Sequence, residues 1–242
     1  DDKKSLAQNY DSEAEFLVKQ IKTVANELFD KDSNSSKLDA LRLSLSEKKA
    51  TFEELLRKEK ELEKILPAED RYIDLVFLTH PQLDHYGGLI DVMKRYRVGM
   101  FIFNGRDGSG AFDELEKVVN EQNIPVMHVA QNDSITFHDS KFSILSPSKN
   151  FLQSAELNET SLVMLLESKN AHALFTGDID KNVEDYLASV AHILPVDILK
   201  VPHHGSRFSS NSNFLNAIQP KISVIEVGAK NTYGHPTQET LT

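Results

Sequence analysis

The chain has 242 residues, 40% of them hydrophobic and 26% charged, a globular composition that is long enough for one α/β domain plus an appendage. Its formal net charge of −10 at pH 7 argues against tight, nonspecific wrapping of nucleic acid, but it allows a metal-centred phosphate site. Cysteine is absent, so disulfides and thiolate metal ligands are excluded. No apolar run approaches the about 20 residues of a membrane helix, and we expect no membrane segment in this chain.

The first region, residues 1–66, is rich in lysine and glutamate and contains no glycine or proline. Apolar residues recur at helical spacing in 16–29 and again in 52–66, and a polar cluster at 30–36 separates the two stretches. Pro67 ends the second stretch. We predict a helical hairpin, in part a short coiled coil, whose second helix packs on the following domain or whose surface contacts another protein or chain.

The second region, residues 67–242, alternates apolar runs of strand length with helical patterns. Strands are predicted at 73–79, 100–103, 126–129, 134–137, 141–145, 161–167, 172–176, 198–201 and 222–227. Helices are predicted at 89–96, 112–122, 182–190 and 213–218. Strands that are joined both by hairpins and by helical crossovers predict an α/β sandwich.

The richest motif is Thr-His-Pro-Gln-Leu-Asp-His-Tyr-Gly-Gly at 79–88, directly after a buried strand. Imidazole and carboxylate are the zinc ligands available without cysteine, and His80, Asp84 and His85 fall within six residues. We expect one loop to present all three, with Gly87 and Gly88 turning the backbone before a helix begins. A capped loop with incidental histidines is the weaker interpretation.

Two later motifs follow the same logic. An apolar strand ends in Thr-Gly-Asp at 176–178, which places Asp178 at the rim of the sheet. Another strand runs into Pro-His-His-Gly-Ser at 202–206, where we expect one histidine of the pair to face the site. Tyr-Gly-His-Pro at 233–236 adds His235 in a rigid turn. The other histidines lack ligand neighbours and are interpreted as structural: His128, His138, His172 and His192.

In this order, together with Asn-x-x-Ser-Leu-Val at 158–163, these motifs resemble the metallo-β-lactamase superfamily. The resemblance covers roughly 62–241 and is nearest to the branch that contains the C-terminal domain of the DNA-internalization competence protein ComEC. It implies an αββα sandwich with one or two metal ions, usually Zn²⁺ and sometimes Mn²⁺, at the edge between the sheets.

Carried over by position, the resemblance assigns roles to individual residues. The implied metal ligands are His80, Asp84, His85, Asp178, His203, His204 and His235. His80 belongs to the first metal site, Asp84 and His85 belong to the second, and Asp178 bridges both. The implied catalytic residues are Asp84, Asp178 and His204. The implied substrate-binding residues are Asn158, Ser161, Lys200 and Ser206.

The sequence departs from the pattern of this branch in three places. Gln82, a neutral amide and a poor ligand, replaces a ligand residue, which predicts weak metal binding at the first site. The helical region stands where the branch has an opening strand pair with Asp-Val-Gly-Gln-Gly-Asp and Asp-Gly-Gly motifs. Relatives also continue past the position of Thr242 into a last strand. We therefore expect a sandwich that is incomplete at one edge.

Three functional hypotheses follow. The leading one is a metal-dependent hydrolase, a phosphodiesterase or nuclease related to DNA uptake, in which a metal ion activates water at neutral pH. The resemblance implies a nucleic-acid substrate and an extracytoplasmic or membrane-associated location in bacteria. One alternative is a non-catalytic module whose metal site has decayed and which acts through its helices. The other is a small-molecule esterase or lactonase, because the fold does not fix the substrate.

Overall fold

The computed structural model describes residues 66, 70–108, 112–169, 171–190, 195–228 and 231–241. The chain divides into two compact units, Asp1–Arg71 and Tyr72–Thr242, and the fold described below is that of the second unit. The predicted helical hairpin lies outside the described residues, apart from Leu66. Among the residues described, no helix combines the length and the apolar character that crossing a bilayer requires.

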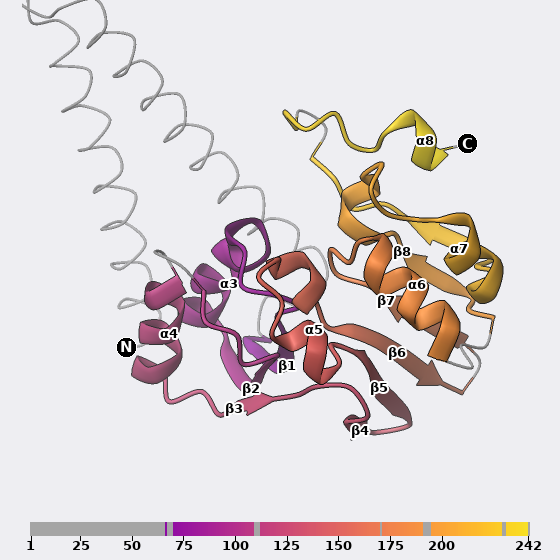
Figure 1. The fold of residues 1–242 in the computed structure, drawn as a ribbon. Helices are drawn as coiled ribbons and strands as arrows, with labels where there is room; N and C mark the ends of the chain where they lie inside the picture. Colours follow the sequence, from indigo (N-terminus) through magenta and orange to yellow (C-terminus); the bar gives the residue numbers. More distant parts are fainter. Residues whose placement is uncertain are drawn as a thin grey trace, which may run out of the picture. The chain divides into compact units, whose positions relative to one another are not determined.

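Two sheets form the centre of this unit (Figure 1). The first is parallel and has the order β1-β2-β3, with the bounds Tyr72–Phe77, Arg97–Phe103 and Val126–His128. The second has the order β4-β5-β6-β7-β8-β9. Its strands are Ser134–Phe137, Ser140–Ser146, Val163–Ser168, Ala171–Phe175, Ile198–Lys200 and Ile222–Val224. Its first four strands pair antiparallel, whereas β7, β8 and β9 are parallel to one another.

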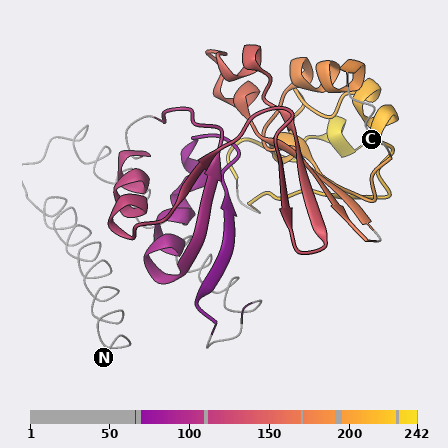
Figure 2. The same ribbon diagram turned by 90° about the horizontal axis from the view of Figure 1, so that it is seen from below.

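Helices cover the outer faces of both sheets (Figure 2). The helices α3 (Leu83–Arg95) and α4 (Phe112–Glu121) pack on the first sheet, and α6 (Lys181–Val190) and α7 (Ser212–Ile218) pack on the second. Short helical segments lie in the connections: α5 (Lys149–Leu152), η1 (Leu157–Thr160), η2 (Pro202–Gly205) and α8 (Gln238–Leu241). A third apolar cluster, with Ile102, Ile144 and Leu162 at its centre, fills the space between the sheets. These four layers confirm the predicted αββα sandwich.

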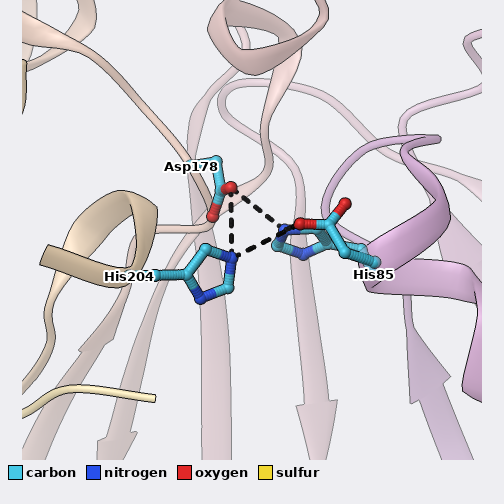
Figure 3. A group of neighbouring side chains, drawn as sticks. His85, Asp178 and His204 are labelled. Carbon is cyan, nitrogen blue, oxygen red and sulfur yellow. Dashed lines mark ion pairs between the residues drawn. The ribbon is translucent and has the colours of Figure 1, made fainter. Parts of the chain in front are cut away.

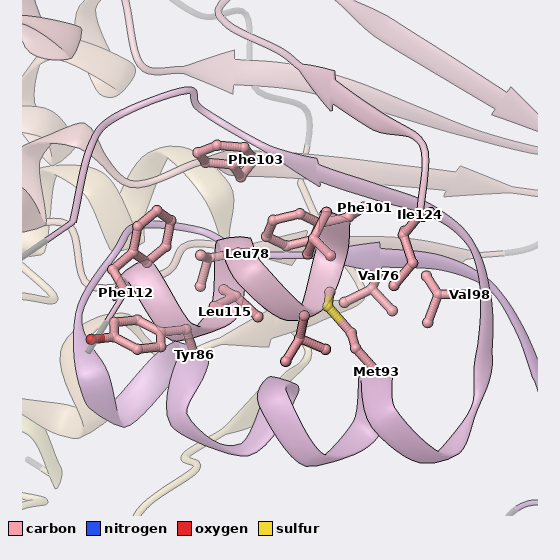
Figure 4. Close-up of a cluster of buried hydrophobic side chains, with 12 residues drawn as sticks. Val76, Leu78, Tyr86, Met93, Val98, Phe101, Phe103, Phe112, Leu115 and Ile124 are labelled. Atoms are coloured by element: carbon pink, nitrogen blue, oxygen red, sulfur yellow. The ribbon is translucent and has the colours of Figure 1, made fainter. Parts of the chain in front are cut away.

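The outer core explains why the α4 sequence is helical. Phe112, Leu115, Val118 and Val119 recur at helical spacing and are all buried against the first sheet. Figure 4 shows Phe112 and Leu115 beside Phe103 of β2 and Leu78, the residue after β1. Each fully buried side chain of this kind contributes about 1.5–3 kcal/mol of transfer free energy. The predicted helix at 112–122 is therefore confirmed almost to the residue.

The expected arrangement of the first motif needs correction. Helix α3 begins at Leu83, so Asp84 and His85 lie in its first turn, not in a loop, and Gly87 and Gly88 lie inside the helix. Burial of Tyr86 and Met93, seven residues apart on one face, stabilises helical backbone through both glycines. Tertiary packing thus overrides the low helix propensity of glycine.

The two faces of the larger sheet differ at β7, β8 and β9. Pairing places Leu174 and Leu199 on the outer face, where both are buried beneath α6 and α7. The opposite face carries Phe175, Ile198, Ile222 and Val224, which remain 37%, 38%, 59% and 48% exposed. Three strands of the first sheet stand against six of the second among the described residues. Among the described residues, the inner face of β7, β8 and β9 is therefore more exposed than their outer face.

Candidate metal centre

The first component of the site is His80, which follows β1 and is completely buried. Its Nδ1 lies 3.1 Å from the Thr79 hydroxyl and 3.2 Å from the Ser161 hydroxyl. The Leu162 amide donates to the Thr79 carbonyl, and this hydrogen bond joins the segment after β1 to the residue before β6. These contacts hold the His80 ring through Nδ1. The other ring nitrogen, Nε2, has no hydrogen-bond partner.

The second component is Asp178 in the turn after β7. Gly177 has φ +57, and a Cβ there would lie 2.9 Å from Ser161 Cβ, so the turn requires glycine at this position. The Asp178 amide donates to the Ser161 hydroxyl at 3.2 Å. Ser161 therefore links the backbone of Asp178 to the ring of His80 through one oxygen atom.

The third component is the His203-His204 pair in η2. Both residues have left-handed backbone, with φ of 49° and 54°, and Gly205 continues the turn at φ +82. Left-handed backbone costs roughly 1–2 kcal/mol per non-glycine residue, so two in succession indicate a constraint imposed by the site. Nδ1 of His204 lies 2.7 Å from the Glu226 carbonyl, which fixes the ring and directs Nε2 toward the carboxylates.

Figure 3 shows that the side chains of His85, Asp178 and His204 converge. Asp84, His85, Asp178 and His204 each offer one ligand atom, and the four atoms lie within 4.8 Å of one another. Oδ2 of Asp178 is 3.1 Å from His85 Nε2 and 3.4 Å from His204 Nε2. Oδ2 of Asp84 is 3.6 Å from His204 Nε2. The Asp84 side chain is 60% exposed, whereas that of Asp178 is only 2% exposed.

The donor atoms of the site lack hydrogen bonds, although they are buried. Buried and without a partner are His80 Nε2, His85 Nε2, Asp178 Oδ1, His203 Nδ1, His204 Nε2 and His235 Nδ1. Oδ2 of Asp178 instead lies within ion-pair distance of the Nε2 atoms of both His85 and His204. Buried polar atoms normally have partners, so this concentration of unpartnered imidazole and carboxylate atoms fits a bound metal ion.

The close contacts within the site shift the pKa values of its groups. Burial alone raises the pKa of the Asp178 carboxyl, but its contacts with His204 and His85 outweigh burial and hold the pKa well below its usual range. In return, Asp178 and Asp84 raise the pKa of His204 to about 10. Burial and the neighbouring His85 lower the pKa of His80 to about 4, which keeps that ring neutral, as a metal ligand must be.

A profile of the Metallo-beta-lactamase superfamily matches residues 49–228, which is more than half of the chain. The chain belongs to the metallo-β-lactamase superfamily. It is also similar to ComE operon protein 3 of Bacillus subtilis (strain 168), with 31% identity over 172 residues, 71% of this chain and 22% of that protein. Competence protein ComA of Neisseria gonorrhoeae is 31% identical over 169 residues, 69% of this chain and 22% of ComA.

The chain therefore spans about a fifth of the length of these curated relatives. Among solved structures, CmlA, a diiron beta-hydroxylase from Streptomyces venezuelae, matches with a TM-score of 0.46 and 16% identity. That match covers 66% of this chain and 36% of CmlA.

The superfamily residues outside the four-residue cluster lie around it. The His80 and His85 rings are 4.2 Å apart between centroids, so His80 borders the cluster. His203 lies next to His235, with ring centroids 5.8 Å apart, and 6.4 Å from His204. His204, not His235, thus completes the group with Asp84 and Asp178. The Gln82 side chain is hydrogen-bonded to His80.

The residues expected to bind substrate take different positions. Asn158 lies in η1, with its buried Oδ1 unpartnered. Ser161 is fully buried between two implied ligand residues, which gives it a supporting position rather than an open one. Ser206 is buried and accepts from the Phe208 amide at 3.3 Å. The Lys200 ammonium donates to the Val201 carbonyl at 3.2 Å.

Sequence reasoning did not single out Asn104. Its side-chain amide donates to the Thr160 carbonyl at 2.7 Å and lies 3.4 Å from the Thr79 carbonyl. It therefore ties the end of β2 to the backbone beside His80 and Ser161. The only available signal was an asparagine directly after the apolar run 100–103, which is too common to identify a role. Of the histidines interpreted as structural, His128 packs edge-on against Phe103 and His192 lies outside the described residues.

Proposed function

We propose that this chain is a metal-dependent hydrolase of phosphodiester bonds, with the metal held by Asp84, His85, Asp178 and His204. The observation that carries the proposal is the convergence of two carboxylates and two imidazoles whose ligand atoms lie within 4.8 Å of one another, with the Nε2 atoms of both imidazoles buried. His80, which borders this group, is the further ligand of a second ion. Zn²⁺ and Mn²⁺ both suit imidazole and carboxylate donors. When bound, such an ion is a Lewis acid that makes water a nucleophile at neutral pH.

The chain's own residues supply orientation and proton transfer. The Glu226 carbonyl accepts the Nδ1 proton of His204, so that Nε2 is left as the ligand atom, an arrangement typical of metal-bound histidine. Asp178, buried and ionised, supplies the central negative charge that holds the cations together. Asp84 is the exposed carboxylate of the group, so it can accept a proton from the attacking water and release it to solvent.

The choice of a phosphodiester rests on the relatives. Similarity to ComE operon protein 3 and Competence protein ComA favours nucleic acid as the substrate and a role connected with DNA uptake. On the same basis we propose an extracytoplasmic or membrane-associated location in bacteria. From the apolar residues at helical spacing in residues 1–66, we also propose that this region contacts another protein or chain. The net charge of −10 places the burden of phosphate binding on the metal rather than on a basic surface.

The test combines metal content with hydrolysis. Purified full-length chain, stripped of metal and titrated with Zn²⁺ or Mn²⁺, is assayed on single-stranded DNA, bis(p-nitrophenyl) phosphate and a panel of lactones. We expect metal-dependent cleavage of both phosphodiesters and at least a 100-fold loss in Asp178→Asn. Asp139→Asn, at the exposed turn between β4 and β5 where Asp139 pairs with Lys169, is the matched control and should retain activity.

Each alternative corresponds to a distinct result. No metal binding above background would contradict the enzyme and support a non-catalytic module. Cleavage of lactones or carboxylic esters alone would retain the metal centre but replace the phosphodiesterase with a small-molecule esterase. Cleavage of bis(p-nitrophenyl) phosphate without DNA would retain the reaction and overturn the nucleic-acid substrate.

A further inference from the structure

Two exposed aromatic side chains lie in the loops that carry the donor residues. The strands β7, β8 and β9 are parallel, so the loops that follow them emerge at one edge of the sheet. The loop after β8 carries His204 and Phe208, and the chain after β9 carries Tyr233 and His235. Phe208 is 63% exposed and Tyr233 is 81% exposed. Both side chains are therefore available to solvent in the loops that also carry the site histidines.

Hydrogen bonds fix Phe208 beside the loop of Asp178. The Ser209 hydroxyl donates to the carbonyl of Ile179, the residue after Asp178, at 2.8 Å. The Lys181 amide donates to the Phe208 carbonyl at 3.2 Å. The guanidinium carbon of Arg207 lies 4.8 Å from the centre of the Phe208 ring. The segment that carries Arg207 and Phe208 is therefore hydrogen-bonded to Ile179 and Lys181, which follow Asp178 closely in the chain.

A chain of ring contacts connects Tyr233 to the same cluster. The Tyr233 ring stacks on His235, with 5.9 Å between centroids and 21° between planes. Asn231 holds His235 in place, since its side chain accepts from the His235 amide at 3.0 Å and donates to the His235 carbonyl at 2.7 Å. His235 contacts the ring of His203, the neighbour of His204. The exposed Tyr233 ring is thus connected to His203 through the ring of His235.

We propose that Tyr233 and Phe208 stack the nucleobases on either side of the scissile phosphodiester of a single-stranded nucleic acid. This inference rests on the proposed function and adds the residues that select the substrate. Base–aromatic stacking tolerates any sequence, because every base has a flat face, and it requires bases that are not already stacked in a duplex. Arg207 over Phe208 adds a cation beside the phosphate backbone.

The charge of the chain favours stacking over electrostatic binding. Proteins that bind nucleic acid through many phosphate contacts lose affinity steeply with salt and have basic surfaces. This chain has 27 basic and 37 acidic residues. Affinity that comes from two stacked bases and one metal-bound phosphate depends only weakly on salt.

The test measures binding, independently of turnover. Fluorescence anisotropy follows a labelled 12-nucleotide oligothymidylate and an abasic strand of equal length, both with cleavage-resistant phosphorothioate linkages, on the chain loaded with Zn²⁺. We expect Tyr233→Ala and Phe208→Ala each to weaken oligothymidylate binding about tenfold or more. Tyr233→Phe keeps the ring and should bind like the original chain. Tyr72→Ala is the matched control, because Tyr72 is also an exposed tyrosine with an arginine over its ring, at the start of β1.

The two strands separate stacking from other contributions. We expect the abasic strand to bind more weakly than oligothymidylate and to be indifferent to Tyr233→Ala and Phe208→Ala. Equal binding of both strands, no binding of oligothymidylate, or an equal loss in Tyr72→Ala would overturn the inference. If the original chain cleaves the unmodified abasic strand and the two alanine variants bind oligothymidylate normally, the inference fails while the proposed function stands. If it cleaves neither strand in unmodified form but oligothymidylate binding depends on Tyr233 and Phe208, the proposed function fails, and the stacking of single-stranded bases stands while their placement around a scissile phosphodiester is overturned.

Discussion

Asp178 is the residue on which the other donors depend, because it is the buried carboxylate that both His85 and His204 approach. The position of its backbone is set by Gly177 and by the hydroxyl of Ser161, not by its own side chain. The same hydroxyl contacts His80. At the level of single residues, the site is a set of imidazole and carboxylate groups whose close approach fits a bound metal ion.

Metal binding should release protons at pH 7. Asp178 and Asp84 raise the pKa of His204 to about 10, whereas a metal ligand must be neutral. Because this pKa lies above the ordinary value of 6.5, the His204 contacts stabilise the metal-free fold fully below pH 6.5, and that stability is lost as pH rises through about 10. Calorimetry of Zn²⁺ binding in buffers of different ionisation enthalpy should show proton release that His204→Gln reduces. Equal release in both proteins would contradict this assignment.

Ser161→Ala should weaken metal binding more than it weakens the fold. Its hydroxyl contacts both His80 Nδ1 and the Asp178 amide, and loss of such supporting contacts costs about 10–100-fold in metal affinity. The cost in free energy of unfolding should be about 1–3 kcal/mol, because a buried amide loses its acceptor. Ser143→Ala on β5, which removes a hydrogen bond to Glu167, is the control and should leave Zn²⁺ affinity unchanged.

At the scale of elements, the site depends on backbone that local sequence disfavours. Helix α3 continues through Gly87 and Gly88, and η2 places His203, His204 and Gly205 in the left-handed region. In both elements the unfavourable backbone is what directs a ligand toward Asp178. Packing against the sheets compensates for its cost.

Gly205→Ala should destabilise the turn and lower metal affinity. Gly205 has φ +82, and an added Cβ would lie 2.7 Å from the Cβ of Pro236. The strain should cost more than about 1 kcal/mol in free energy of unfolding and displace His204. Gly228→Ala is the matched control, because an added Cβ there meets nothing within 4 Å. Urea denaturation and Zn²⁺ titration of both variants test this, and equal behaviour would refute a special role for the turn.

At the scale of the whole unit, the sandwich is well packed on its outer faces and open on part of its inner face. Leu199 on β8 is buried, whereas Ile222 on the adjacent β9 is largely exposed on the opposite face. The fold therefore gains little stability from the exposed face of β7, β8 and β9. Asp178 and His204 follow β7 and β8. The buried outer face of the sheet fixes the positions of these two strands.

Leu199→Ala and Ile222→Ala should differ strongly in stability. Leu199 sits in a closed core, so its truncation should cost about 2–5 kcal/mol in free energy of unfolding. Ile222 is 59% exposed, and its truncation should cost less than about 1 kcal/mol. The two variants are compared by urea denaturation monitored by circular dichroism. Similar losses would show that the inner face of β9 is covered in solution.

The order and approximate bounds of the strands and most helices could be predicted from the sequence, because apolar periodicity is local and reflects which face of an element is buried. The sequence also identified the motifs that hold His80, Asp84, His85, Asp178 and the late histidines, since each follows an apolar strand or occupies a tight turn. It could not place Asp84 and His85 in a helix, because only packing of Tyr86 and Met93 stabilises that helix through two glycines.

Which of the candidate metal-ligand residues lie close together could be seen only in the three-dimensional fold. Asp84 and His204 are 120 positions apart in the chain, and the distance between their side chains depends on how both sheets stack. His204 joins the cluster because two consecutive left-handed residues and the Glu226 carbonyl orient its ring, features that residue types alone do not encode. Local patterns specify elements, whereas the meeting of ligands is a property of long-range packing, and so it had to be seen in three dimensions.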